Sequence, residues 1–367
     1  MNLLFKIFKM EKIKYKINNL KLKIHDYFSM KRSMNNVMKI SVKYFVTSID
    51  FNDVYYGNKN PKRFKKCVLI FIVMLLMTFG CISVILSDDL YSLIDSPSLP
   101  RHFRTLLLLG AFSAIMILVA KTDLILGEIK SNLNDFKIFY YLMNDIKSKH
   151  KLSKANYKKL AILSRIIQIL IMNYALKFGI IFGSVLIIKI AIDFKNLIYQ
   201  WIIIIFTIPF LIICTFTAAS LFFVFAILFY YYKLLFDQIS DHFELISNRK
   251  SLVINKMIEK QLIRLIYEHN LASIKVKKIN LLFRRTAACI FIVFSFVKII
   301  SLYLFNYSDD IIIRFVLFNT VIIFVIFGFA MSYFFSLQIK SAHQSYKTIH
   351  LIICKCKMAF NLKLKVS

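Results

Sequence analysis

Glycine and proline are scarce in this 367-residue sequence, with 7 and 4 copies, and tryptophan occurs once. Loop-rich folds and β-barrels need many more turn residues, so we expect neither. The sequence has no Gly-rich phosphate-binding loop and no serine nucleophile motif, and its histidines are scattered. We therefore predict that the protein is not an enzyme and that it holds no metal or cofactor.

The six cysteines do not form the pattern of a disulfide-stabilised protein. Four lie in or beside apolar runs, and the other two, Cys354 and Cys356, lie in the basic C-terminal tail. None falls in a segment that the charge pattern places outside the cell, so we expect no disulfide framework. The tail pair resembles a juxtamembrane palmitoylation target, although two incidental thiols explain it equally well.

Apolar residues, in contrast, dominate the sequence, at 59% with a mean hydropathy of +0.65. A helix needs about 20 apolar residues to cross the hydrocarbon core of a bilayer. The sequence therefore predicts an all-α, polytopic transmembrane helical bundle with six spans. These spans are 67–86, 104–125, 166–192, 197–225, 286–305 and 314–337.

Positive charge is distributed unevenly between these spans, and the net charge of +31 reflects that placement. The segments 1–66, 121–165, 233–285 and 338–367 are basic, whereas 87–103, 193–196 and 306–310 carry few cations. Since cytoplasmic loops are enriched in Lys and Arg, the alternation predicts a multi-pass protein with a cytoplasmic N-terminus. We expect membrane lipids, and not nucleic acid, to be the partner of this charge. The sequon at Asn306 then lies outside, where glycosylation is possible.

Three regions follow from this topology: a basic cytoplasmic N-terminal region at 1–66, a transmembrane domain at 67–337, and a basic cytoplasmic tail at 338–367. Lysines alternate with apolar residues over 12–23. This segment is interpreted as lying on an anionic membrane surface or as a solvated arm.

The run 197–232 is long enough to raise the question of one span or two. Its only punctuation is Pro209, and splitting it would move the basic block 233–285 outside. We therefore predict one long fourth helix that extends into a cytoplasmic helical region, with the aromatic residues of 222–232 forming an interfacial belt. Within 233–285, apolar residues at helical spacing predict an amphipathic helix leading into the fifth span. Its apolar stripe must pack on its own protein or on another subunit.

A few polar residues lie inside the predicted spans, and such residues are functional candidates. Asn173 and Lys177 either line a polar cavity or mark a helix that starts in the cytoplasm and enters the bilayer near Phe178. Gly179 and Gly183 have the GxxxG spacing that permits close helix contact. The remaining polar residues in the spans are Lys189, Lys298 and Asn319.

This arrangement resembles the arthropod gustatory/odorant chemoreceptor superfamily. The stretch LIRLIYEHNLASIKVKKINLLFRR (262–285) is similar to that family's segment before its fifth span, and SLQIKSAHQSYKTIHLIICK (336–355) is similar to the segment joining its sixth and seventh. The resemblance implies seven spans, the last ending in a Thr-Tyr…Gln-Phe type motif and lining the pore of a tetramer. Here no apolar run follows Asn361, so we expect a fragment, an incorrect gene model or a divergent member.

The resemblance also implies a function: a gustatory-type chemosensory receptor in the plasma membrane. Such a receptor is a ligand-gated cation channel subunit that detects a small-molecule tastant or odorant and forms a homo- or hetero-tetramer with related subunits. Our ligand-binding candidates are Asn173, Tyr174, Tyr199 and Trp201, although the last two fit outer-interface anchors better. The alternatives are a membrane transporter or scaffold without a sensory role and, less favoured, an intramembrane enzyme.

Overall fold

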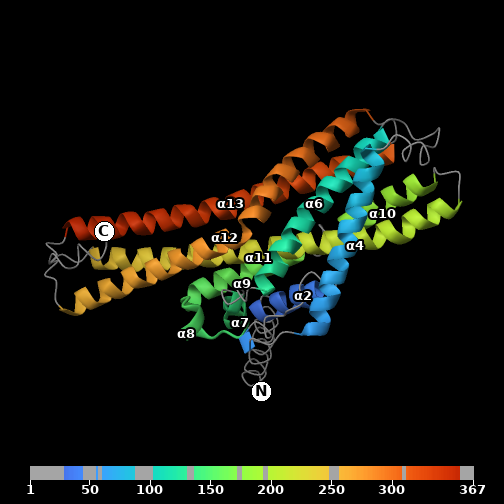
Figure 1. Ribbon diagram of the computed structural model, residues 1–367. Helices are drawn as coiled ribbons and strands as arrows, with labels where there is room; N and C mark the ends of the chain where they lie inside the picture. The colour runs from blue at the N-terminus through green and yellow to red at the C-terminus, as the bar shows by residue number, and fades with distance from the viewer. Residues whose placement is uncertain are drawn as a thin grey trace, which may run out of the picture.

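The described part of the protein is built almost wholly from helices (Figure 1). A computed structural model describes residues 29–43, 55–56, 60–86, 102–129, 136–171, 176–192, 197–247, 256–307 and 311–355. No strand occurs within these residues, which confirms the all-α prediction. The helices are α2 (Met30–Lys43), α4 (Pro61–Leu86), α6 (His102–Ile129), α7 (Lys137–Met143), α8 (Lys147–His150), α9 (Lys154–Leu170), α10 (Leu176–Ile192), α11 (Leu197–Ser247), α12 (Lys256–Tyr307) and α13 (Ile311–Lys355).

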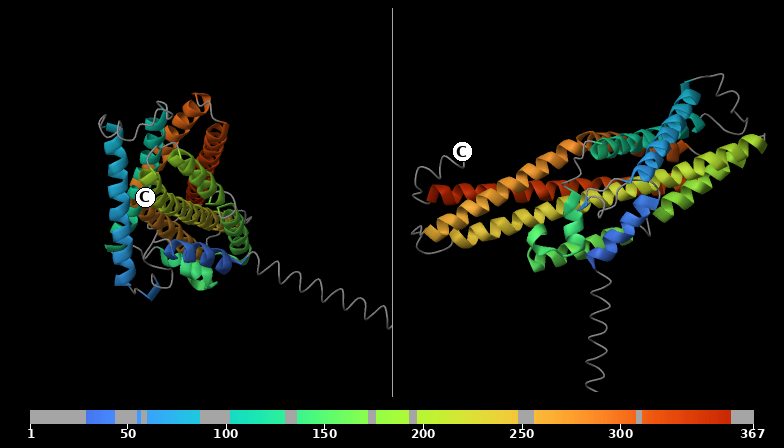
Figure 2. Two further views of the ribbon diagram at one scale, coloured as in Figure 1. Left: turned by 90° about the vertical axis from the view of Figure 1, so that its right-hand side faces the viewer. Right: turned by 60° about the horizontal axis from the view of Figure 1, so that its bottom comes forward.

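Three helices, α11, α12 and α13, are much longer than the others, with 51, 52 and 45 residues. At 1.5 Å per residue, each of the first two is about 75 Å long. They run side by side along much of the molecule (Figures 1 and 2). The prediction of one helix over 197–232 is confirmed, since α11 continues through Pro209. The amphipathic segment also leads into the predicted fifth span within one helix, α12.

The long helices connect two halves of the molecule. We call the part that holds the predicted spans the apolar half; it contains α4, α6, α10 and segments 197–225, 286–307 and 311–337 of the long helices. The basic half contains α2, α7, α8 and α9, with the remainder of the three long helices. In Figure 1 the small helices of the basic half gather beneath α11. Every long helix therefore passes through both halves.

Two segments of the described residues are long and apolar enough to cross a membrane, judged by length and composition. They are Thr207–Ile246 in α11 and Ile313–Ile352 in α13. The α11 segment is largely covered by the rest of the protein, whereas the α13 segment is largely uncovered. The other predicted spans correspond to helices of the structure, and their crossing of a membrane remains a prediction.

Two predictions about the apolar runs differ from the structure. The run 166–192 falls on two elements, because its first residues belong to α9, which packs on α2 and α11 with Arg165 and Gln168 buried. The aromatic belt over 222–232 is wrong, because α11 is the central helix and its neighbours cover it on several sides. Five of these aromatic side chains are at most 8% exposed: Phe223, Phe225, Phe229, Tyr231 and Tyr232.

The amphipathic helices of the basic half cover each other. Leu262, Leu265 and Ile266 of α12 are buried in the cluster formed with α11 and α13, so the apolar stripe packs on its own protein. Met30 and Met34 of α2 are buried in the same cluster. The segment 12–23 lies outside the described residues.

Helices α10 and α11 approach closely at the predicted GxxxG pair. A Cβ atom at Gly179 would lie 3.0 Å from Thr215 Cγ2, and one at Gly183 would lie 3.0 Å from Leu211 Cδ1 with a second methyl closer still. Such distances are shorter than ordinary van der Waals contact. The two glycines therefore allow α10 to lie against α11.

Candidate functional site

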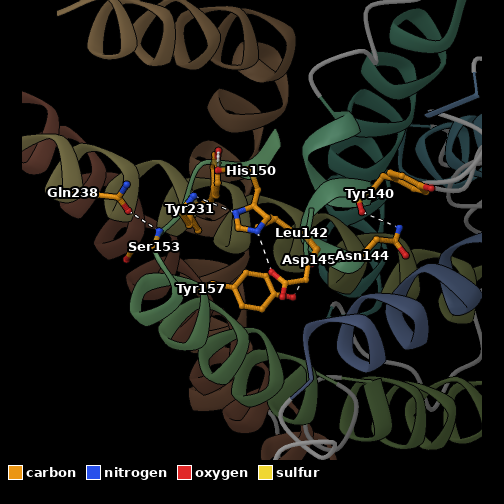
Figure 3. Close-up of polar contacts among 10 residues, drawn as sticks. Tyr140, Leu142, Asn144, Asp145, His150, Ser153, Tyr157, Tyr231 and Gln238 are labelled. Atoms are coloured by element: carbon orange, nitrogen blue, oxygen red, sulfur yellow. Dashed lines mark hydrogen bonds and ion pairs between the residues drawn. The ribbon is translucent and has the colours of Figure 1, made fainter. Parts of the chain in front are cut away.

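The turn region between α7 and α9 carries the densest set of long-range polar contacts among the described residues (Figure 3). Two residues there have left-handed backbone conformations, Asp145 with φ 50° and Lys151 with φ 60°. Lys151 caps α8 by donating its N–H to the carbonyl of Lys147, as left-handed C-cap residues do. Ser153 then caps α9, because its hydroxyl accepts from the N–H of Asn156 at 3.3 Å. Lys151 and Ser153 thus mark the end of α8 and the start of α9.

His150 is the centre of this region, which we call the His150 junction: residues 142–157 together with Tyr231 and Gln238. Its side chain is completely buried. Nδ1 accepts a hydrogen bond from the N–H of Leu152 at 3.1 Å, and Nε2 lies 3.2 Å from Oδ1 of Asp145. Since Nδ1 is an acceptor, the proton of the neutral ring belongs on Nε2, which donates to the carboxylate. The Tyr157 ring stacks on the imidazole with centroids 5.2 Å apart.

Helix α11 holds the junction through two side chains that lie two turns apart. The Tyr231 hydroxyl donates to the carbonyl of His150 at 2.7 Å. Gln238, two turns further on, accepts from the N–H of Ser153 at 2.8 Å and donates to the carbonyl of Lys151 at 3.1 Å. These bonds satisfy backbone groups that a turn cannot pair by itself. The junction is therefore attached to α11 by backbone contacts that do not depend on side-chain charge.

The other two long helices contact α11 close to the same level. Asp237 of α11 accepts a hydrogen bond from the Ser341 hydroxyl of α13 at 2.7 Å and forms an ion pair with Lys233. Glu268 of α12 lies 3.8 Å from Nζ of Lys151 in the junction. All three long helices therefore meet at, or next to, the His150 junction.

A second buried histidine, His269 of α12, lies in the same three-helix region. It is 6% exposed, and its ring lies 5.4 Å from that of Phe236. Within the described residues, its Nε2 has no hydrogen-bond partner. A buried nitrogen of this kind is poorly placed to accept a proton, because the resulting charge would be unsolvated.

The ionisation of these groups follows from their burial. Burial lowers the pKa of His150, and the Asp145 carboxylate opposes that shift only partly. Burial likewise lowers the pKa of His269. Burial, with a smaller contribution from Asp145, raises the pKa of Tyr157 to about 12, so its hydroxyl stays protonated and donates to the carbonyl of Leu142 at 2.8 Å. Both histidines, His150 in the junction and His269 beside it, are therefore neutral in the folded protein.

We expect the protein to lose stability as the pH falls below about 6.5, the ordinary pKa of histidine. Below that pH both histidines become protonated in the unfolded chain, while His150 and His269 stay neutral in the folded protein. Stability is therefore lost as the pH falls from the ordinary histidine pKa to the lowered pKa of the folded state. The slope of this loss is up to about 1.4 kcal/mol per pH unit for each histidine. Melting temperatures of the detergent-solubilised chain at several pH values measure it. The double variant His150→Gln/His269→Gln should flatten this profile and His242→Gln, at an exposed position, should not; an unchanged slope in the double variant would contradict the assignment.

A second set of buried polar side chains lies in the apolar half, where α6 contacts α4, α11 and α12. Thr286 of α12 donates to Oδ2 of Asp123 from its N–H at 3.2 Å and from its hydroxyl at 2.6 Å. Lys121, two residues before Asp123 on α6, lies within electrostatic range of Cys67 of α4 and Cys214 of α11. We call these five residues the α6 polar layer. It brings buried polar side chains of four helices to one level.

The structure brings none of the predicted ligand-binding residues to a described pocket. Asn173 and Tyr174 lie outside the described residues, and so does the side chain of Tyr199. Trp201 is 58% exposed on α11, which suits an interface anchor as well as a ligand contact. The ligand-binding assignment stays a prediction.

The predicted modification sites and the prediction of no metal also remain predictions. Asn306 is exposed near the end of α12. The side chain of Cys354 and all of Cys356 lie outside the described residues. Among the residues that the structure describes, no group of three or more potential metal ligands occurs.

Sequence reasoning missed His150 and Asp123, whose partners on other helices are distant in the sequence. The sequence did carry a signal for His150. The basic segment Lys147–His150 followed by Ser153 is typical of the end of one helix and the N-cap of the next. Comparison with family models, curated proteins and solved structures found no match for this chain.

Proposed function

We propose that this protein is a gustatory-type chemosensory receptor, a multi-pass plasma-membrane protein with a cytoplasmic N-terminus. In this proposal it is a subunit of a ligand-gated cation channel, acts as a homo- or hetero-tetramer with related subunits, and detects a small-molecule tastant or odorant. The apolar half lies in the membrane and the basic half in the cytoplasm, and ligand enters among the outer parts of the helices.

One observation carries the proposal: α11, α12 and α13 each run without a break from the apolar half into the basic half and meet there around the His150 junction. A continuous helix moves as a rigid element, so a displacement at one end reaches the other. In this proposal, the amphipathic bundle at the far ends of these three helices couples ligand binding to subunit contacts. A scaffold has no use for this coupling.

Current recordings test the proposal directly. We expect oocytes that express the full chain, alone or with related subunits, to show an inward cation current on exposure to at least one compound from a panel of sugars, amino acids and alkaloids. Replacing external cations with N-methylglucamine should abolish the current, and injected GDPβS should not, since the channel opens without a G protein. Uptake of radiolabelled compound without any such current would instead identify a transporter.

Glycosylation tests the topology that the proposal needs. The sequence holds one sequon, Asn306-Tyr307-Ser308, at the proposed outer side. We expect an endoglycosidase to shift the chain from insect cells on a gel, and Asn306→Gln to abolish the shift. The substitution Lys250→Thr makes Asn248 a second sequon in the proposed cytoplasmic block. A glycan at Asn248 would place the basic half outside and refute the topology.

A further inference from the structure

One face of α12, just before Thr286, alternates exposed cations with exposed apolar side chains. We call it the α12 basic face. Its members recur at spacings of three, four and seven, so they lie along one side of the helix. All six are exposed: Ile274, Lys277, Lys278, Leu281, Arg284 and Arg285.

The position of this face along α12 can be given relative to the α6 polar layer. Arg284 and Arg285 immediately precede Thr286, which is bonded to Asp123 of α6. Beyond Thr286, the exposed side chains of α12 become apolar, and they include Phe291, Ile292 and Ile299. The change from cations to apolar residues thus occurs at the polar layer.

Helix α4 changes in the same way at the same level. Its exposed Lys65 and Lys66 precede Cys67, which lies within electrostatic range of Lys121 in the polar layer. Leu69 and Leu76, on the same side of α4, are 61% and 63% exposed. Two helices that both contact α6 therefore switch from exposed charge to exposed apolar surface together, as expected where a protein surface passes from lipid headgroups to acyl chains.

Among the side chains that the structure describes, no carboxylate is available to the cations of the α12 basic face. From His269 to the end of α12 the sequence contains no acidic residue. Asp123, on the neighbouring helix, is buried and already accepts two hydrogen bonds from Thr286. The face is a net positive surface of four cations, with no ion pair recorded for any of them among the described residues.

We propose that the α12 basic face binds the phosphate headgroups of anionic phospholipids in the cytoplasmic leaflet; this rests on the membrane topology of the proposed function. Guanidinium and ammonium groups bind phosphate oxygens, and the interspersed Ile274 and Leu281 fit the apolar part of the interface. A soluble phosphate compound would leave these two side chains without a partner. A second copy of the chain on this face would oppose four cations with four more.

The test uses the full-length chain, captured in a neutral detergent, and measures binding of dioctanoyl phosphatidylinositol bisphosphate by surface plasmon resonance. We expect saturable binding that dioctanoyl phosphatidylcholine does not reproduce. The variant Lys277→Gln/Lys278→Gln/Arg284→Gln/Arg285→Gln should bind at least about tenfold more weakly, since each cation near an anionic lipid surface contributes roughly a factor of five. The control Lys158→Gln/Lys159→Gln/Lys340→Gln/Lys347→Gln removes four exposed cations elsewhere and should bind as the wild type does.

Three results would overturn the proposal: equal binding by the test variant, equal binding of the neutral lipid, or full competition by inositol trisphosphate, which would identify a soluble ligand. Should the fourfold variant be polydisperse, the pairs Lys277→Gln/Lys278→Gln and Arg284→Gln/Arg285→Gln are measured separately and must each weaken binding. Extraction of the chain from membranes by alkaline carbonate would refute the topology itself. An integral chain that fails to bind the lipid refutes only the lipid site.

Discussion

Replacing His150 by leucine is expected to lower the free energy of unfolding by about 2–4 kcal/mol, which is large for a single substitution. Leucine fills much of the same space but leaves the buried N–H of Leu152 without its acceptor, at a cost of about 1–3 kcal/mol. The bond to Asp145 and the stacking on Tyr157 are lost as well.

The measurement is the melting temperature of a fluorescent fusion in detergent, followed by size-exclusion chromatography after heating. His242→Leu is the matched control, because His242 is exposed on α11 and the same change of residue removes no buried bond there. Equal melting temperatures for the two variants would show that the His150 junction does not contribute to stability. Asparagine at position 150 should recover part of the loss, since its side-chain oxygen is a potential acceptor for the Leu152 N–H.

Gly183→Ile is expected to separate α10 from α11 and to destabilise the apolar half by about 1–3 kcal/mol, the usual cost of inserting side-chain atoms into a filled contact. Even the first added carbon meets Leu211. In a membrane, where helices associate mainly by close packing, this loss has no hydrophobic compensation from water. We also expect reduced surface expression and, in the proposed channel, a reduced current.

Gly80→Ile provides the control for this second substitution. Gly80 lies in α4, and a Cβ there would meet nothing within 4 Å. We expect the free energy of unfolding of that variant to lie within about 0.5 kcal/mol of the wild-type value, as is usual for surface substitutions. If Gly80→Ile and Gly183→Ile were equally destabilised, helix propensity and not the α10–α11 contact would explain the effect.

The His150 junction also bears on how the stability of the protein depends on pH. His150 is neutral in the folded state, so acidification weakens its contact with the N–H of Leu152 inside the junction. Protonation of Nδ1 replaces an acceptor with a donor that faces the Leu152 N–H. We therefore expect the pH profile of stability to follow these contacts rather than the net charge of the chain.

Sequence patterns identified the elements that depend on local composition. The run 197–232 predicts one helix, α11, because Pro209 is its only punctuation and splitting it would move the basic block 233–285 outside. Periodic apolar residues in 256–285 predict the first part of α12. The GxxxG spacing at Gly179 and Gly183 correctly pointed to a close helix contact, since its cause is the size of two neighbouring residues on one face.

What the sequence alone determined, then, is the helical class, the long helices α11 and α12 and the placement of charge, because each depends on residues near one another in the chain. The continuation of α13 to Lys355, through the predicted tail, was not predicted. Only the tertiary structure decided that the aromatic residues of α11 are core, that His150 is bonded to α11, and that Asp123 meets Thr286 at a separation of 163 residues. Burial and hydrogen bonding of this kind depend on which helices become neighbours. Which helices become neighbours depends on how whole helix faces pack together, and patterns of residues along the sequence do not reveal it.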